Sequence, residues 1–431
     1  MSRAVPRSER TARSRPSSHR RAAVIRAGAP QPVGGAGAPA AAAVLAGVRR
    51  IGAPFRDEVV ADTGLSHATV NRQVVALIEA GLLRERPDLV RPGTVGRPRV
   101  PVEIDQDRFG VLGLHVGLQR TTLSVGDLRG TVLAAVDVPT PSGDDPCHTL
   151  GILSEKLRRF GDRFGERLVL QVGLVIGGQL SGDRDLLGHR RLGWDTAPIA
   201  EIVDRVVLSD VIMVPQIEAM AGAESLLSPH VDEGTTLHVY AREAVGAVLT
   251  VDGHVHAPSA GPGTISHLPV GGTTSCPCGR IGCLEASVGD SAVAGAAHRA
   301  GLVDAPQIER VIAAAAGGSR AAHALLVERA HLLGRGVALV RDVLNPDRVV
   351  LAGQAFTAYR PGLAHVSESF SGSTALPPMS LQVSSFGPAL QAVAACTAAL
   401  RPIYADPLAV LRKVAARDRP EPVPHRKATP R

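Results

Sequence analysis

The stretch Cys-Pro-Cys-Gly-Arg-Ile-Gly-Cys-Leu-Glu at residues 276–285 brings three thiols together within eight residues. Its two glycines let the backbone turn sharply, so that the sulfurs of Cys276, Cys278 and Cys283 can face one point. His267, nine residues upstream, can complete a Cys₃His tetrahedron, a ligand set that zinc prefers. Protein atoms would then fill all four positions, so the pattern predicts a structural zinc loop over 267–283 rather than a catalytic metal.

Other interpretations of this loop stay open. His254 and His256 compete with His267 as the fourth ligand, and the thiols could be three reduced cysteines without a metal. Cys147 and Cys396 stand apart, and we expect both to be plain buried thiols. The five cysteines do not have the pattern of a disulfide framework, which favours a reducing compartment.

The composition is that of a globular protein with two or three domains. The 431 residues are 45% hydrophobic and 20% charged but only 3% aromatic, which favours tight helix–sheet packing over an aromatic ligand cage. No apolar run reaches 18 residues, so we expect no membrane span. The apolar stretch 38–48 could belong to a secretory signal, but Arg49 and Arg50 follow at once and a helix explains it better.

Positive charge collects at the N-terminus, where eight arginines lie in the first 26 residues and only Glu9 opposes them. We expect residues 1–36, which lack apolar periodicity, to be a disordered basic tail. Such a tail suits a non-specific DNA-binding arm. An inert tail or a wrongly assigned start codon is the alternative.

The sequence next predicts three short helices and a two-stranded wing. The helices are predicted over 40–51, 56–63 and 67–80. Gly64 closes the second helix, and Ser66 is a typical N-cap for the third. Residues 82–104 hold a basic, glycine-bearing loop between two apolar segments, as in a hairpin. Residues 37–104 are therefore predicted to form a winged helix-turn-helix.

The free face of the third helix carries only side chains that can donate hydrogen bonds to base edges or phosphates. These are His67, Thr69, Asn71, Arg72 and Gln73. In a helix-turn-helix this face enters the major groove, where Asn and Gln can pair with adenine and Arg with guanine. Arg97 and Arg99, in the wing sequence Gly-Arg-Pro-Arg, suit a minor groove or the DNA backbone. The alternative is an amphipathic helix pair that only packs on the body.

After residue 108 short strands alternate with helices. Strands are predicted at 111–116, 122–128, 132–138, 168–176 and 349–351, and helices over 149–164 and 388–400. We expect 108–404 to form an α/β body and 405–431 to be a polar, frayed tail.

Both motifs resemble the ROK family (repressors, open reading frames, kinases). The resemblance rests on Thr-Gly-Leu-Ser-His-Ala-Thr-Val at 63–70, Leu-Ile-Glu-Ala-Gly-Leu-Leu at 77–83, Gly-Arg-Pro at 96–98 and the cysteine stretch. The cysteine stretch matches the family signature at every defined position, although the Gly-His before it is Ser266-His267 here. The resemblance implies a two-lobed actin- and hexokinase-like (ASKHA) fold, joined to the helix-turn-helix, and assembly into homodimers or tetramers.

The residues that family kinases use for catalysis are mostly replaced. His115 stands where the kinases have an Asp in their first phosphate motif, and Gln216 or Ile217 stands where the catalytic Asp takes the proton of the sugar hydroxyl. Glu218 would lie one or two positions away, on a different face. We therefore expect no phosphoryl transfer and no enzyme activity.

The sugar site also departs from the family pattern. The second phosphate turn reads Arg-Glu-Ala-Val-Gly at 242–246, and Pro215 replaces a residue of the usual sugar site. Thr264 replaces a sugar-binding Glu, whereas Glu285 is kept. Thr264 and Glu285 mark a candidate ligand pocket, although Glu285 could equally make a structural hydrogen bond beside the zinc loop.

The sequence thus favours a cytoplasmic, homodimeric transcriptional regulator that associates with the nucleoid when bound to DNA. Of the two kinds of regulator, it favours a repressor. Its partner would be double-stranded DNA with an inverted-repeat operator, and its cofactor a structural zinc ion. A small-molecule effector in the body would bias the DNA-binding domains. The alternatives are a sugar or amino-sugar kinase with an atypical active site, and a scaffold for a protein partner.

Overall fold

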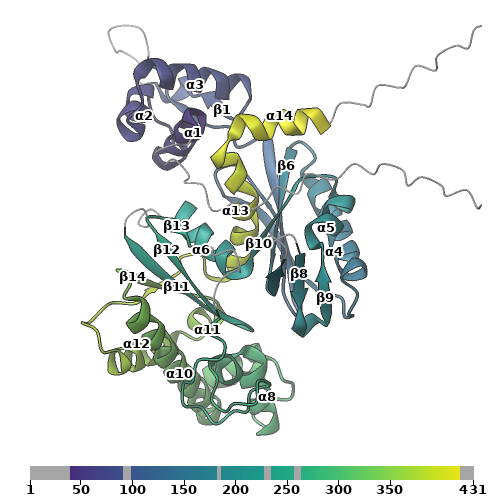
Figure 1. Cartoon of the computed structure of the whole chain (residues 1–431), viewed down its shortest axis with the longest axis vertical. Helices are drawn as coiled ribbons and strands as arrows, with labels where there is room; N and C mark the ends of the chain where they lie inside the picture. Colours follow the sequence, from purple (N-terminus) through teal and green to yellow (C-terminus); the bar gives the residue numbers. More distant parts are fainter. Residues whose placement is uncertain (1–38, 91–98, 182–185, 228–233, 257–263, 418–431) are drawn as a thin grey trace, which may run out of the picture.

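The computed structural model describes residues 39–90, 99–181, 186–227, 234–256 and 264–417. The chain forms a small N-terminal helical domain and two α/β lobes that follow one another along the long axis of the molecule (Figure 1). Among the helices of these ranges, none combines the length and the apolar character needed to cross a bilayer.

The N-terminal domain has the elements that the sequence predicts. They are α1 (Ala40–Ile51), α2 (Arg56–Thr63), α3 (His67–Glu79), β1 (Leu83–Glu85) and β2 (Val102–Ile104), with a 3₁₀ turn at Pro87–Leu89. Gly64 ends α2 in the left-handed conformation, with a φ of 67°. The hydroxyl of Ser66 accepts a hydrogen bond from the backbone N–H of Thr69 at 3.2 Å, so the predicted cap of α3 is confirmed. The strands β1 and β2 pair antiparallel as the base of the wing.

The first lobe is built on a five-stranded sheet in the order β10-β6-β3-β4-β5. Its strands are β3 (Phe109–Val116), β4 (Arg120–Gly126), β5 (Val132–Pro139), β6 (Leu168–Ile176) and β10 (Val211–Pro215). A smaller antiparallel sheet beside it contains β7 (Gln179–Ser181), β8 (Leu186–His189) and β9 (Trp194–Ala197). The helices α4 (Pro146–Gly161) and α5 (Ile199–Val207) cover one face of the large sheet, where apolar side chains of β3, β4 and β6 meet them.

The opposite face of this sheet is covered by α13 (Leu390–Ala405), which lies almost directly on the strands. Two strand glycines permit this contact. A Cβ atom at Gly113 would come within 2.8 Å of the Ala395 side chain, and one at Gly173 within 1.9 Å of the Ala395 carbonyl oxygen. Any larger residue at either position would push the helix off the sheet.

The second lobe repeats the strand plan of the first. Its sheet has the order β13-β12-β11-β14-β15, with β11 (Thr235–Ala241), β12 (Val245–Val251), β13 (His254–Val255), β14 (Arg348–Ala352) and β15 (Gln382–Val383). In both lobes the first three strands in chain order pair antiparallel with one another. The fourth strand then pairs parallel with the first, and the fifth pairs parallel with the fourth. The duplication of this plan gives the two-lobed fold, although the sequence has no simple repeat.

Eight helices complete the second lobe and its junction with the first. They are α6 (Gln216–Leu227), α7 (Leu284–Val288), α8 (Asp290–Arg299), α9 (Ile308–Ala316), α10 (Arg320–Leu344), α11 (Gln354–Thr357), α12 (Arg360–Ser373) and the shared α13. The long α10 packs against α12 along much of its length (Figure 1).

The C-terminal stretch from Asp406, expected to be frayed, instead forms α14 (Pro407–Arg417). Apolar side chains at Leu408, Val410 and Leu411 give it an inner face that packs on the N-terminal domain. Lys413 also forms an ion pair of 2.8 Å with Asp210 at the end of the first lobe. The expectation failed because the Pro- and Arg-rich composition hid this apolar spacing.

Two smaller expectations were also wrong in part. Cys147 is exposed rather than buried, because it lies in the first turn of α4, where Asp145 caps the helix. Cys396 is buried as expected. The helix predicted over 149–164 begins three residues earlier, at Pro146, and its last residues form a 3₁₀ turn.

Candidate nucleic-acid interface and metal centre

The outer face of α3 presents several of the side chains singled out for DNA reading. His67, Asn71 and Arg72 are exposed, whereas Thr69 and Gln73 are half-buried. The hydroxyl of Thr69 lies 2.9 Å from that of Ser66 and so takes part in the helix cap. Three exposed polar side chains of the predicted set therefore share the free surface of the helix, while Thr69 is partly committed to its start.

The arginines of the wing differ in how far other side chains hold them. Arg97 lies outside the described residues. Arg99 is exposed and forms a 2.5 Å ion pair with Asp57 of α2, and its guanidinium carbon lies 5.8 Å from the centre of the Phe55 ring. Arg84 and Arg86 are held by Glu103, which is almost completely buried, at 2.7 Å and 2.6 Å. The wing is thus less positive than its arginine count indicates, because its base is internally neutralised.

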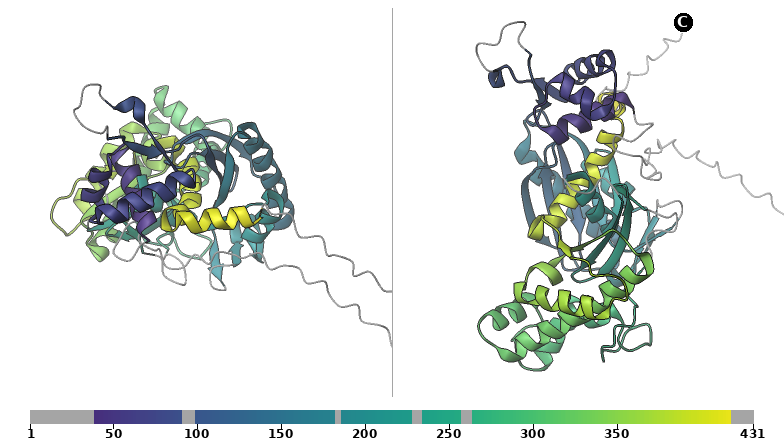
Figure 2. Two further views of the ribbon diagram at one scale, coloured as in Figure 1. Left: turned by 90° about the horizontal axis from the view of Figure 1, so that it is seen from above. Right: turned by 90° about the vertical axis from the view of Figure 1, so that its left-hand side faces the viewer.

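The core of the N-terminal domain continues into the body. Val44, Leu45 and Val48 of α1 lie in one apolar cluster with Ile403 and Tyr404 of α13. Figure 2 shows the yellow C-terminal helices reaching the purple N-terminal helices in both views. The chain therefore offers a continuous packed route from the helix-turn-helix to the body.

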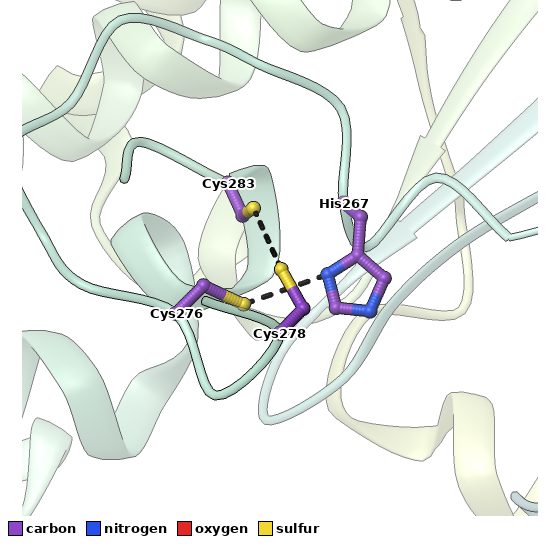
Figure 3. A group of neighbouring side chains, drawn as sticks. All are labelled: His267, Cys276, Cys278 and Cys283. Atoms are coloured by element: carbon purple, nitrogen blue, oxygen red, sulfur yellow. Dashed lines mark hydrogen bonds between the residues drawn. The ribbon is translucent and has the colours of Figure 1, made fainter. Parts of the chain in front are cut away.

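The four predicted zinc ligands come together in one cluster. His267, Cys276, Cys278 and Cys283 offer ligand atoms that all lie within 4.8 Å of one another, and Figure 3 shows the three sulfurs and the imidazole pointing toward a common centre. The Nδ1 of His267 is 3.5 Å from the Cys276 sulfur, and the sulfurs of Cys278 and Cys283 are 3.6 Å apart. A tetrahedral zinc site with ordinary bond lengths has ligand–ligand distances of about 3.6 to 3.8 Å, so these residues fit the ion.

Tight backbone turns and a nearby cation shape this cluster. Gly279 and Gly282 have φ angles of 87° and 75°, which only glycine adopts readily. The Arg280 guanidinium lowers the pKa of the Cys278 thiol to about 6, whereas burial raises the pKa of Cys283 to about 11. His254 and His256, the competing histidines, are not in the cluster that the described residues form.

The three residues that the sequence aligns with kinase catalytic positions, His115, Gln216 and Ile217, lie on β3 and at the start of α6. His115 is buried in β3, where desolvation and the charge of Arg242 lower its pKa to about 4. Gln216 is the first residue of α6, and Ile217 follows it with its side chain packed against Gly246 of the second phosphate turn. Glu218 is buried in the same helix.

The phosphate turn itself carries a carboxylate that bridges the two lobes. Glu243 accepts hydrogen bonds from the Ser291 backbone N–H and hydroxyl, and its carboxylate forms an ion pair with Arg191 of the first lobe. Sequence reasoning missed Arg191, since no motif surrounds it and only the fold places it opposite Glu243.

The two residues of the candidate ligand pocket are both engaged by protein groups. Glu285 accepts hydrogen bonds from the Val245 backbone N–H at 3.0 Å and from the Ser266 hydroxyl at 2.9 Å. The hydroxyl of Thr264 accepts one from the Ser266 backbone N–H at 3.2 Å. Glu285 thus ties the start of the zinc loop to the phosphate turn.

Comparison with known sequences places the chain among regulators. It is 41% identical over 393 residues to the transcriptional regulator Rv0485 of Mycobacterium tuberculosis, covering 88% of this chain and 89% of that protein. It is 23% identical over 329 residues to the DNA-binding transcriptional dual regulator NagC of Escherichia coli, covering 73% and 80%.

Solved structures and a family model agree on the fold. The crystal structure of a ROK family transcriptional regulator, a homologue of the E. coli MLC protein, superposes with a TM-score of 0.69 at 22% identity, covering 87% of this chain and 98% of that one. A ROK hexokinase from Thermus thermophilus superposes with a TM-score of 0.54 at 24% identity, covering 68% and 99%. The model of the ROK family matches residues 111–371. The chain therefore belongs to the ROK family.

Proposed function

We propose that this ROK-family transcriptional regulator is a repressor that binds double-stranded DNA by placing α3 in the major groove. The observation that carries the proposal is the exposed polar face of His67, Asn71 and Arg72 on a well-capped helix of a helix-turn-helix. Gln73 adds a contact at the edge of that face. Each of these side chains can donate hydrogen bonds to base edges.

Arg97 and Arg99 contact the minor groove or the backbone beside the reading helix. Arg99 already lies at the protein surface and is held in place by Asp57 and Phe55. Two subunits related by a two-fold axis then bind an inverted-repeat operator, with half-sites separated by one or more helical turns.

The Cys₃His group holds a structural zinc ion. When bound, zinc supplies four strong bonds to the loop and no open position for a reactant. Its ligands span the loop before α7, and the same loop positions Glu285 against the phosphate turn. The ion therefore keeps the second lobe in shape rather than performing chemistry.

The body does not transfer phosphate. The apolar side chain of Ile217 packs against Gly246, and neither Ile217 nor Gln216 can accept a proton from a sugar hydroxyl as a carboxylate would. In the same turn the carboxylate of Glu243 would repel a phosphate, and Arg191 and Ser291 hold it there. Both features disfavour the alternative of a kinase with an atypical site.

The helix α13 links the lobes to the DNA-binding domain. At the start of α13, the amide nitrogen of Gln391 lies 3.5 Å from the hydroxyl oxygen of Tyr240 in the second lobe. At its end, Tyr404 packs on α1. A small-molecule effector that prefers one arrangement of the lobes would thus bias the DNA-binding domains through α13. The contact of Arg191 with Glu243 favours the arrangement described here.

A single charge removal on α3 tests the proposal. Arg72→Ala should weaken binding to the operator by about 1–3 kcal/mol if the side chain grips a base. Arg299→Ala is the matched control, because it removes an exposed arginine from α8, at the far end of the molecule (Figure 1). Equal affinities of the two variants would remove Arg72 from the set of residues that read bases.

A further inference from the structure

A second group of metal-ligand side chains lies where α10 packs against α12 in the second lobe. His331 comes from α10, and His365 and Glu368 come from α12. Their ligand atoms all lie within 4.8 Å of one another. This group shares no residue with the Cys₃His cluster, and no sequence motif marks it apart from the His-x-x-Glu spacing on α12.

The geometry within the group is close to that of a coordination sphere. His365 and Glu368 are three residues apart and therefore on the same face of the helix, with Nδ1 and Oε2 3.5 Å apart. Two ligands of a tetrahedral zinc ion bound through nitrogen and oxygen are about 3.3 Å apart. The rings of His331 and His365 meet edge to face with their centres 5.3 Å apart, so both can direct a nitrogen to one ion without stacking.

The Nδ1 atom of His365 gives an independent reason to look for a ligand. This atom is shielded from solvent and makes no hydrogen bond within the described residues, although the Glu368 carboxylate lies nearby. A buried ring nitrogen without a hydrogen bond is costly. A cation between the imidazole and the carboxylate would satisfy it.

The two helices are held firmly at this level. The hydroxyl of Ser369 donates a hydrogen bond to the His331 carbonyl at 2.7 Å. Gly334 permits the close crossing, because a Cβ atom there would come within 2.5 Å of the Val366 carbonyl oxygen. The ligands are thus carried on rigid elements whose separation is fixed by packing, which favours a preorganised site.

We propose that His331, His365 and Glu368 bind a divalent transition-metal cation of the zinc class. Two imidazoles and one carboxylate suit such an ion and not calcium or magnesium, which prefer oxygen ligands alone. Three protein ligands leave a position for water. The side chain of Glu368 is 73% exposed and that of His365 33% exposed, so the ion has a path from solvent. Its binding would join α10 to α12.

Zinc uptake by the full-length protein tests this site. The protein is stripped with a chelator and titrated with zinc, and the bound ions are counted by elemental mass spectrometry. The wild type should bind one more ion per chain than His331→Ala or His365→Ala. His298→Ala, which removes an exposed histidine of α8 outside both groups, should bind as many ions as the wild type.

Glu368→Gln distinguishes loss of a zinc ligand from misfolding, because this exposed side chain can change to an amide without disturbing the helix packing. It should retain the wild-type circular dichroism spectrum and weaken uptake of the additional ion. Cobalt added to protein whose cysteine site is already filled with zinc should give a visible spectrum without thiolate charge transfer. Equal zinc uptake by the wild type and all three cluster variants would overturn the proposal and leave a plain contact between His365 and Glu368.

Discussion

The guanidinium of Arg49 in α1 lies 5.4 Å from the centre of the Tyr404 ring near the end of α13. The Tyr404 hydroxyl in turn donates a hydrogen bond of 2.7 Å to the Leu128 carbonyl of the first lobe. One buried side chain therefore contacts both the DNA-binding domain and the body. This arrangement gives the regulator a mechanical connection that a flexible linker would lack.

Tyr404→Phe should lower the free energy of unfolding by about 1–3 kcal/mol, because the buried Leu128 carbonyl loses its donor while the ring stays over Arg49. Denaturant unfolding measures the change. Tyr359→Phe is the control, since its hydrogen bond with His323 lies at the exposed surface and water can replace it. Equal losses in the two variants would contradict the special role of Tyr404.

Replacing any one of Cys276, Cys278 and Cys283 by Ser should release the zinc ion and lower the melting temperature, because the loop loses a ligand. Metal content and thermal unfolding check the two effects. Cys147→Ser removes an exposed thiol outside the cluster and should keep both at wild-type values. A purified wild type whose cysteine loop carries no metal would refute the zinc assignment.

Acid should destabilise the body through His115. Burial and the charge of Arg242 lower the pKa of His115 from its ordinary value of 6.5 to about 4 in the folded state, so the unfolded state takes up the proton first as pH falls. Stability is therefore unaffected above pH 6.5 and decreases by about 3 kcal/mol between pH 6.5 and 4. His115→Leu should flatten the dependence of unfolding free energy on pH in that window. Burial also lowers the pKa of His238 to about 4, so part of the slope should remain.

Removing the carboxylate at the base of the wing should loosen the wing. Glu103→Gln leaves Arg84 and Arg86 without their shared buried partner and should cost about 1.5–3 kcal/mol. Hydrogen exchange at β1 and β2 reports the local effect. The control is Glu155→Gln, which removes an ion-pair carboxylate at the surface of α4 and should change the free energy of unfolding far less. Comparable losses of stability in the two variants would argue against a structural role for Glu103.

Local sequence signals predicted the elements whose causes are local. Gly64 ends α2 in the left-handed conformation, and Ser66 caps the start of α3. Both effects depend on neighbouring residues and can therefore be predicted from the sequence. The cysteine loop was predictable for the same reason, because its ligands are close in sequence and its glycines set the turns. The family resemblance supplied the two-lobed fold.

Contacts between distant residues were not predictable in this way. Arg191 and Glu243 are separated by 52 positions, and their pairing depends on how the lobes meet. The helix α14 was missed because its apolar residues gain their partners from distant segments, among them α1, α13 and β6. His331 and His365 come together only because Gly334 lets two helices cross closely.

The most direct test of the central claim is binding of the full-length protein to the DNA upstream of its own gene and to a scrambled sequence of equal length, across a salt series. Phosphate contacts alone weaken steeply with salt and do not distinguish the two sequences. A sequence-specific regulator should prefer the upstream DNA by about 10³-fold or more, and this preference should persist as salt rises. Equal affinity for both sequences at every salt concentration, with genome-wide binding also finding no preferred site, would contradict a sequence-specific regulator.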